Sequence, residues 1–186
     1  ILAARVMLLN ASSRILGPSN RLLAKLASAG ADFETATLEG VAGSEPAFAT
    51  MMNRLGTAIG LTNSNFVNAT GLPDADQYST ARDLATIARF IIAQFPEYYP
   101  IFSETEFTWN KIRQLNRNSL IELGLGVDGL KTGHTEASGY GEVVSTAASG
   151  RRLIAVLHGM TSMNERTEEA RKLVSWGTRG FELVPV

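Results

Sequence analysis

The last third of the chain contains three extended segments joined by short glycine turns, and this feature constrains the fold most. The segments cover residues 129–135, 139–148 and 153–158, and Gly150 is centred between the second and the third. Consecutive strands joined by so few residues pair antiparallel, because a parallel pair needs a crossover of a dozen residues or more. The sequence therefore predicts an antiparallel sheet here.

Helical patterns fill the middle of the chain. Ser44 and Pro46 are typical of a helix start, residues 62–77 are rich in turn formers, and Ser79 or Thr80 precedes a helix at about 81–94. A closing helix is expected at 165–177 and extended residues at 105–109. Earlier in the chain, one helix is expected after Asn20 and a second from Asp32 to about Val41. A hairpin is expected near residues 5–16, where Ser12 and Ser13 belong to its turn. Strands from both ends with helices between them predict an α+β fold, an antiparallel sheet flanked by helices.

Apolar residues at helical spacing predict the buried faces of these helices. Three such groups are Phe48, Met51, Met52 and Leu55; Leu84, Ile87, Ala88, Ile91 and Ile92; and Ala170, Leu173, Val174 and Trp176. The aromatic residues Phe95, Tyr98, Tyr99, Trp109 and Trp176 are expected in the core.

The composition excludes several functions. The 186 residues carry 17 basic and 18 acidic side chains, so no field attracts nucleic acid. Cysteine is absent, and His134 and His158 lack the spacing of a metal site, so no metal or cofactor is expected. No apolar run approaches the roughly 20 residues that span a bilayer. Residues 1–9 are expected to be a buried strand, and residues 1–186 one domain.

The residues Lys131-Thr132-Gly133, followed by His134 and a strand, resemble a motif of the serine D-alanyl-D-alanine carboxypeptidases, the low-molecular-weight penicillin-binding proteins. Other segments resemble the same family: residues 43–53, 65–73, 78–84, 95–99, 107–110 and 116–118. The resemblance implies a β-lactamase/transpeptidase-like fold. It also implies that Lys131 attracts the carboxylate of a D-Ala-D-Ala peptide or a β-lactam, Thr132 adds a hydroxyl, and Gly133 admits the substrate to the strand edge. His134 is expected beside the site as a neighbour, and the 116–118 turn near its entrance without an identified role.

Two other motifs of that family are missing. No Ser-x-x-Lys occurs in the chain, and Thr108 with Lys111 is the only hydroxyl pair at that spacing, in an extended segment. The family's Ser-x-Asn aligns with Ala29 and Ala31, and a shift of one residue would restore a serine at Ser28 but not the asparagine. Between the predicted hairpin and this point only about a dozen residues remain, and the family's C-terminal β-rich domain is not found. The fold is therefore expected to be truncated, and no catalytic residue is identifiable.

Three functions follow from this reading. The first is an inactive relative acting as a structural or binding subunit, with a protein partner covering the truncated face. The second is an active serine carboxypeptidase whose nucleophile segment is missing from the sequence. The third is a non-catalytic receptor for peptidoglycan peptides or β-lactams through Lys131. The resemblance also implies a periplasmic location, or one on the outer face of the cytoplasmic membrane.

Overall fold

The computed structural model describes residues 41–109, 111–148 and 150–181. The chain divides into two compact units, Ile1–Ile87 and Ala88–Val186, which are described separately. The expected hairpin near residues 5–16, the helix expected after Asn20 and the 29–32 segment lie outside the described residues. Of the helix expected from Asp32 to about Val41, only its last residue is described, and Val41 and Ala42 are helical. The expectation of a single domain stays a prediction.

The first described helix, α4 (Glu45–Ala58), begins where its sequence predicts. The Ser44 hydroxyl accepts a hydrogen bond from the Ala47 amide at 3.3 Å, and a proline lies in the first turn. Phe48 and Met52 are buried as expected. Met51 was predicted to be buried and is 37% exposed, so this prediction is wrong. The buried stripe follows the i+4 direction to Gly56, which turns Met51 outward.

The loop after α4 packs back onto that helix. Phe48, Met52 and Ala69 form a small core, which Leu55 and Phe66 partly cover. Asn53 of α4 ties the loop down: its side chain donates to the Phe66 carbonyl at 2.7 Å and accepts from the Phe66 amide at 2.9 Å. The predicted loop at 62–77 is confirmed, since its only regular pairing is an isolated bridge, Asn65 to Tyr78.

Helix α5 (Ala81–Gln94) has the predicted bounds. Thr80 is its cap, because the Thr80 hydroxyl accepts from the Asp83 amide at 3.2 Å. Ile87, Ala88 and Ile91 are buried as predicted.

The second unit is built on a three-stranded antiparallel sheet in the order β3-β4-β5. Its strands are β3 (Val127–Thr135), β4 (Gly139–Ala148) and β5 (Arg151–Met160). Gly139 has φ +65°, and a Cβ atom there would lie 2.7 Å from the Met160 carbonyl oxygen, so only glycine fits this turn. The predicted sheet and its glycine turns are confirmed.

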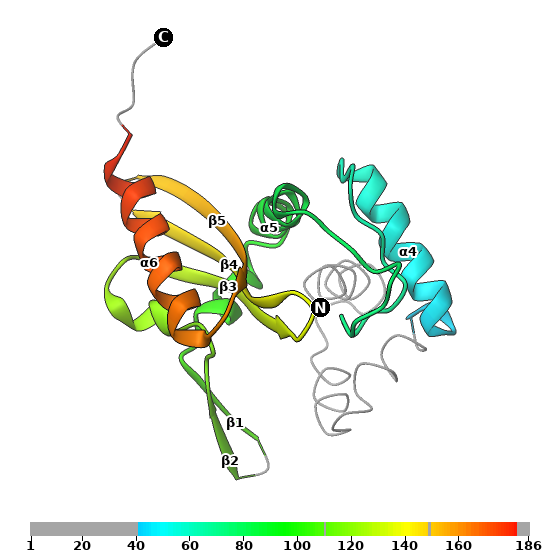
Figure 1. Ribbon diagram of the computed structural model, residues 1–186, viewed down its shortest axis with the longest axis horizontal. Coiled ribbons are helices and arrows are strands. Elements are labelled where there is room, and N and C mark those ends of the chain that lie inside the picture. The colour runs from blue at the N-terminus through cyan, green and yellow to red at the C-terminus, as the bar shows by residue number, and fades with distance from the viewer. Residues whose placement is uncertain (1–40, 110, 149, 182–186) are drawn as a thin grey trace. The chain divides into compact units, whose positions relative to one another are not determined.

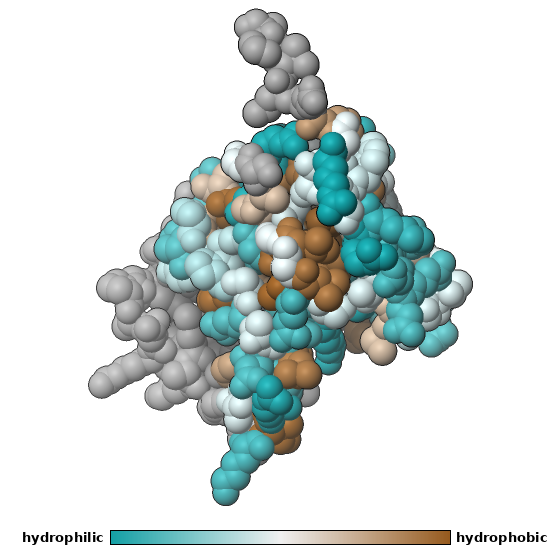
Figure 2. Space-filling view, turned by 90° about the vertical axis from the view of Figure 1, so that its left-hand side faces the viewer, coloured by the Kyte–Doolittle hydropathy of each residue, from teal (hydrophilic) through white to brown (hydrophobic). Residues whose placement is uncertain are grey.

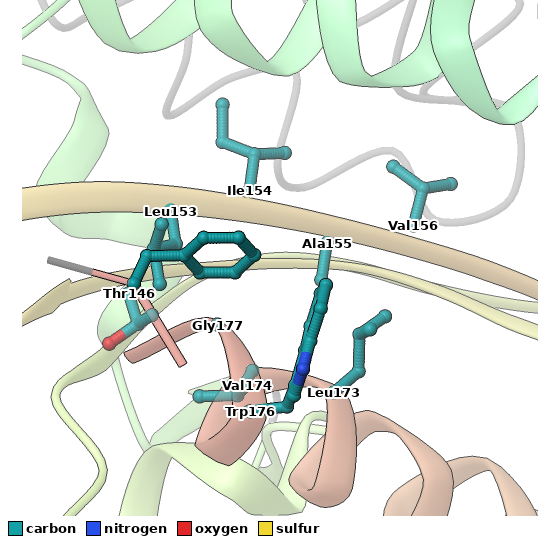
Figure 3. A pocket seen from close by; sticks show the side chains of 10 residues that line it. Thr146, Leu153, Ile154, Ala155, Val156, Leu173, Val174, Trp176 and Gly177 are labelled. Atoms are coloured by element: carbon teal, nitrogen blue, oxygen red, sulfur yellow. The ribbon is translucent and has the colours of Figure 1, made fainter. Parts of the chain in front are cut away.

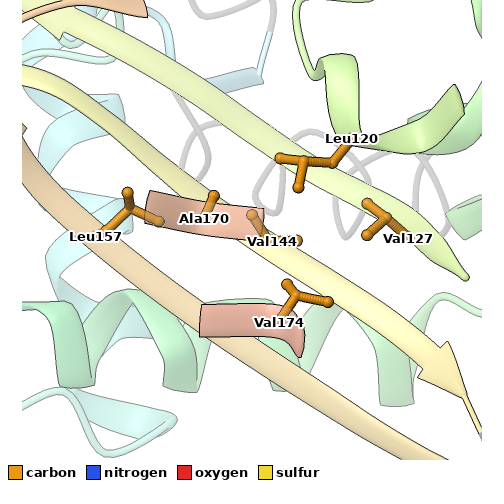
Figure 4. Packing of buried hydrophobic residues seen from close by; sticks show 6 residues of the cluster. All are labelled: Leu120, Val127, Val144, Leu157, Ala170 and Val174. Carbon is orange, nitrogen blue, oxygen red and sulfur yellow. The ribbon is translucent and has the colours of Figure 1, made fainter. Parts of the chain in front are cut away.

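Helix α6 (Met163–Arg179) lies on one face of this sheet (Figure 1). The core between them is apolar (Figure 4) and comprises Leu120, Val127, Val144, Leu157, Ala170 and Val174. Trp176 was expected to join this core, but it is 61% exposed and packs edge-on against Phe181, with ring centroids 4.9 Å apart. Ala170, Val174 and Gly177 form the buried face of α6, and Trp176 lies outside that arc.

Shorter elements complete the second unit. They are the 3₁₀ helices η1 (Tyr99–Ser103) and η2 (Ser119–Leu123) and a hairpin of β1 (Glu106–Trp109) and β2 (Ile112–Leu115), which projects from the sheet (Figure 1). Phe95 and Tyr99 are buried as predicted and Tyr98 is half-buried, whereas the Trp109 side chain lies outside the described atoms. In the described part of the chain, no helix is both long and apolar enough to cross a membrane. The predicted α+β class, with helices and antiparallel sheets, is confirmed.

Candidate carboxylate-binding site on strand β3

The four predicted site residues follow one another on β3. This strand lies at the edge of the described sheet, where it pairs with β4 alone. Lys131 is half-buried, Thr132 is buried, and Gly133 and His134 are exposed. A strand edge presents backbone N–H and C=O groups to a partner, so β3 has the geometry needed to pair with an extended peptide.

The strand alternation divides these residues between the two faces of the sheet. Lys131 and Gly133 share one face, and Thr132 and His134 share the other. Across the ladder Thr132 lies opposite Glu142, and His134 lies opposite Tyr140, with which it stacks at 4.0 Å between ring centroids. The predicted role of the Thr132 hydroxyl at a ligand carboxylate stays a prediction.

Open space lies beside Gly133. Among the residues that the structure describes, a Cβ atom built at this position would meet no atom within 4 Å. Two residues earlier, the Lys131 ammonium contacts the carbonyl oxygen of Thr132. Among the described residues, this face of β3 therefore combines a cation with open space at Gly133.

The Asn116-Arg117-Asn118 turn is hydrogen-bonded to the start of β3. Asn118 is buried, donates to the Gly129 carbonyl at 3.1 Å, and caps η2 by accepting from the Leu120 amide at 3.0 Å. Asn116 in turn accepts from the Asn118 amide at 3.0 Å. The sequence offered no role for this turn, although Asn before Ser119-Leu120 is a typical helix-cap signal.

A polar cluster ties the first residues of β3 to both other strands. The Asp128 carboxylate accepts from the Tyr99 hydroxyl at 2.8 Å and pairs with the Arg152 guanidinium at 2.8 Å. Arg152 also donates to the Ser145 hydroxyl at 2.6 Å and lies over the Tyr99 ring. Burial, reinforced by the Asp128 carboxylate, raises the pKa of Tyr99 well above its usual range. The cluster thus holds Tyr99 protonated as a donor.

A buried ion pair lies on the α6 side of the sheet. The Arg166 Nε atom is 3.5 Å from Glu142 Oε2, and the two side chains are 6% and 1% exposed. Burial raises the pKa of Glu142 to about 7, against the opposing effect of the Arg166 charge. Both carboxylate oxygens and Arg166 Nε lack a hydrogen-bond partner among the described residues. The contact is therefore electrostatic, without hydrogen-bond geometry.

A second buried carboxylate, Asp83, organises the loop of the first unit. It accepts hydrogen bonds from the Asn63 amide at 2.8 Å, the Ser64 hydroxyl at 2.7 Å and the Thr62 amide at 3.4 Å. Burial raises the pKa of Asp83, but these hydrogen bonds outweigh it, so the net pKa is lowered. Neither Asp83 nor Glu142 was found by sequence reasoning, because each stands in an otherwise ordinary helix or strand pattern.

Among the described residues, the hydroxyl–lysine pair that the sequence offered as a nucleophile does not lie on a helix. Thr108 lies on β1 and Lys111 in the turn that follows, so this pair belongs to the projecting hairpin and not to a helix. No group of three or more His, Cys, Asp or Glu side chains that could hold a metal occurs in the described ranges.

Comparison with known proteins identifies the family. The sequence profile of the D-alanyl-D-alanine carboxypeptidases, peptidase family S11, matches residues 19–162. The D-alanyl-D-alanine carboxypeptidase DacA of Haemophilus influenzae is 44% identical over 155 residues, which cover 82% of this chain and 39% of that protein. DacC of Escherichia coli is 46% identical over 145 residues, covering 77% and 36%.

Solved structures agree with the sequence relatives. Penicillin-binding protein 5 of Haemophilus influenzae superposes with a TM-score of 0.75 at 44% identity, covering 78% of this chain and 43% of that one. Penicillin-binding protein D2 of Listeria monocytogenes, in its cefotaxime-bound form, gives a TM-score of 0.71 at 27% identity, covering 78% and 60%. The transpeptidase-like fold is thus confirmed, while the chain spans about two fifths of the length of the curated relatives it matches. The chain belongs to the D-alanyl-D-alanine carboxypeptidase family, peptidase family S11.

Proposed function

We propose that the Lys131–Gly133 strand binds the terminal carboxylate of a peptidoglycan peptide ending in D-Ala-D-Ala, or that of a β-lactam. The proposal also holds that the residues of this chain form no acyl-enzyme by themselves. The observation that carries it is that Lys131 and Gly133 lie on the same face of a strand at the edge of the described sheet, with open space at Gly133 among the described residues. An extended peptide adds to such an edge through main-chain hydrogen bonds, and the ammonium group supplies the charge that a carboxylate requires.

Two further observations support the proposal. Relatives of this chain are named for action on D-alanyl-D-alanine, and a structural neighbour is a penicillin-binding protein in its cefotaxime-bound form. The 186 residues contain no Ser-x-x-Lys pair to supply a nucleophile. A binding role in the periplasm, or on the outer face of the cytoplasmic membrane, follows by analogy with the family.

The test combines reversible binding with a search for a covalent product. Calorimetric titration with the tripeptide diacetyl-L-Lys-D-Ala-D-Ala measures binding to the wild-type chain, to Lys131→Ala, and to Lys111→Ala as a control in the exposed hairpin turn. A charge-assisted hydrogen bond contributes about 1.5–3 kcal/mol, so Lys131→Ala is expected to weaken binding by about 10- to 100-fold. Equal affinity of the wild type and Lys131→Ala contradicts the proposal.

A second candidate is a working serine carboxypeptidase of which these residues are one part. The specific observation in its favour is that the chain spans only 39% of the Haemophilus influenzae DacA protein. Intact mass spectrometry of the protein purified from its natural source, before and after exposure to benzylpenicillin, distinguishes the candidates. A mass increase of one penicillin supports a nucleophile and this second candidate, and an unchanged mass supports the binding role.

A structural role with a protein partner is favoured by one surface feature. An apolar cavity of ≈ 280 Å³ lies between β5 and α6 (Figure 3), next to the exposed rings of Trp176 and Phe181. Hydrophobic surface is visible on the side of the molecule that carries α6 (Figure 2). Exposed apolar patches of this kind are typical of interaction sites. Light scattering on the purified chain tests this role, and a monodisperse monomer argues against it.

A further inference from the structure

The Glu142–Arg166 pair lies next to the proposed binding strand: Glu142 is on the neighbouring strand β4, and Arg166 is on helix α6. Glu142 is on the central strand β4, opposite Thr132 on β3 and Leu157 on β5. Directly opposite residues of a ladder point to the same face, so the buried Glu142 and Thr132 side chains are neighbours on the α6 side. No residue therefore separates Glu142 from Thr132 across the ladder.

A second connection reaches β3 through the 116–118 turn. The Arg166 Nη2 atom donates to the Arg117 carbonyl at 3.1 Å. The next residue, Asn118, donates to the carbonyl of Gly129, two positions before Lys131. The Arg166 guanidinium thus contacts both the carboxylate behind Thr132 and the turn that holds the start of β3.

A contribution to folding stability does not explain why this ion pair is buried here. Both oxygens of Glu142 and the Nε of Arg166 lack hydrogen bonds among the described residues, although they are buried. Well-packed apolar residues in the same space are often as stable as a buried ion pair, or more stable, because they avoid desolvating two charges. A costly pair next to a binding strand is consistent with a role in function.

We propose that Glu142 and Arg166 are positioning residues that hold the Lys131–Gly133 strand in the geometry its carboxylate ligand requires, an inference that rests on the function proposed above. They touch no ligand themselves. They act through Thr132 across the ladder and through the Arg117 carbonyl. Small displacements of a binding group weaken its interactions steeply, so a modest change in the pair is enough to alter affinity.

The pair also makes the position of the strand sensitive to pH. The pKa of Glu142 is raised to about 7 by burial, so its charge is lost just below neutral pH. The groups that face it are Arg166 from α6, Thr132 from β3 and Leu157 from β5. The stacked His134 and Tyr140 are the next pair along the same face. Glu142→Gln leaves His134 unchanged and therefore separates the contribution of Glu142 from that of this neighbour.

The test measures tripeptide affinity against pH. Diacetyl-L-Lys-D-Ala-D-Ala is titrated into the wild-type chain, Glu142→Gln and Arg166→Lys between pH 5.5 and pH 8.5. Wild-type binding is expected to weaken by about 10-fold as the pH falls through 7, within the range of typical couplings between two sites. Glu142→Gln binds weakly at every pH, and Arg166→Lys retains part of the pH dependence because it keeps the charge.

Control variants separate positioning from a general loss of stability. Arg171→Leu removes an exposed arginine from the same helix and is expected to leave the pH profile unchanged. If Glu142→Gln keeps the wild-type affinity and pH profile while Lys131→Ala loses binding, the positioning role is wrong and the proposed function stands. If the wild type binds no tripeptide, or Lys131→Ala binds as well as the wild type, the proposed function fails and this inference fails with it.

If a variant does not fold, a measurement on the ligand-free wild-type chain still tests the proposal. In nuclear magnetic resonance spectra of the wild-type chain, the Thr132 and Gly133 amides are expected to titrate with the same midpoint as the Glu142 carboxyl carbon. Amide resonances of these two residues that do not change across that midpoint overturn the proposal.

Discussion

The buried Glu142 carboxyl makes the stability of the second unit depend on pH in a direction opposite to that of most surface carboxylates. In the folded chain its pKa is about 7, because burial disfavours the charge. In the unfolded chain the same group titrates near its ordinary value of 4.5. Between these values the folded state binds the proton and the unfolded state does not, so the free energy of unfolding falls as pH rises from 4.5 to 7.

The magnitude follows from the two pKa values. Each pH unit of difference is equivalent to about 1.4 kcal/mol, so the contribution lost between pH 4.5 and pH 7 is about 3 kcal/mol. His158 opposes this trend, because partial burial lowers its pKa and its contribution to stability increases with pH. The two effects are separated by comparing the wild type with a variant that lacks only the Glu142–Arg166 pair.

The variant is Glu142→Leu with Arg166→Leu. Replacing a buried ion pair by apolar residues is often neutral or stabilising by about 1–4 kcal/mol, so we expect the double variant to match or exceed wild-type stability at pH 8. Arg166→Leu alone leaves a buried charge without its partner and is expected to cost about 3–5 kcal/mol at pH 8, and less at pH 5, where Glu142 is protonated.

The assay is urea unfolding at pH 5 and pH 8, followed by tryptophan fluorescence. Both tryptophans, Trp109 and Trp176, belong to the second unit, so the signal reports its unfolding. The exposed Glu168–Arg171 pair is the control, and its replacement by glutamines is expected to leave the pH dependence unchanged. If the double variant shows the same pH dependence as the wild type, Glu142 does not titrate in this range and the reasoning is refuted.

Two further predictions concern other buried groups. Asp83→Asn is expected to destabilise the first unit by about 2–3 kcal/mol, because it loses charge-assisted hydrogen bonds from the 62–64 backbone and side chains, and thermal unfolding by circular dichroism measures it. Since the pKa of Asp83 is lowered in the folded state, its contribution is lost as pH falls below about 3.8. Asp76→Asn in the exposed loop is the control and is expected to leave the stability unchanged. Leu120→Ala, in the core between the sheet and α6, is expected to lower the free energy of unfolding in urea by about 2–5 kcal/mol. Leu123→Ala, exposed on the same 3₁₀ helix, is expected to lower it by less than about 0.5 kcal/mol. Equal losses in Leu120→Ala and Leu123→Ala would contradict the assigned core.

Local patterns in the sequence determined the elements and the family. The starts of α4 and α5 follow from Ser44 and Thr80, whose hydroxyls cap the first turn using neighbouring residues only. The glycine turns at 139 and 150 separate the strands for the same reason, since a positive φ is a property of one residue. The Lys131-Thr132-Gly133 motif and its surroundings were enough to identify the family.

Burial and side-chain partners were decided by the tertiary structure. Glu142 reads as an ordinary strand residue until β4 becomes the central strand and α6 places Arg166 over it. Trp176 is apolar at a helical spacing, yet the packing direction of α6 leaves it outside the core. These outcomes depend on residues that are far apart in sequence and meet only on folding, whereas caps, turns and motifs depend on neighbours, and for that reason the sequence alone determined the latter and not the former.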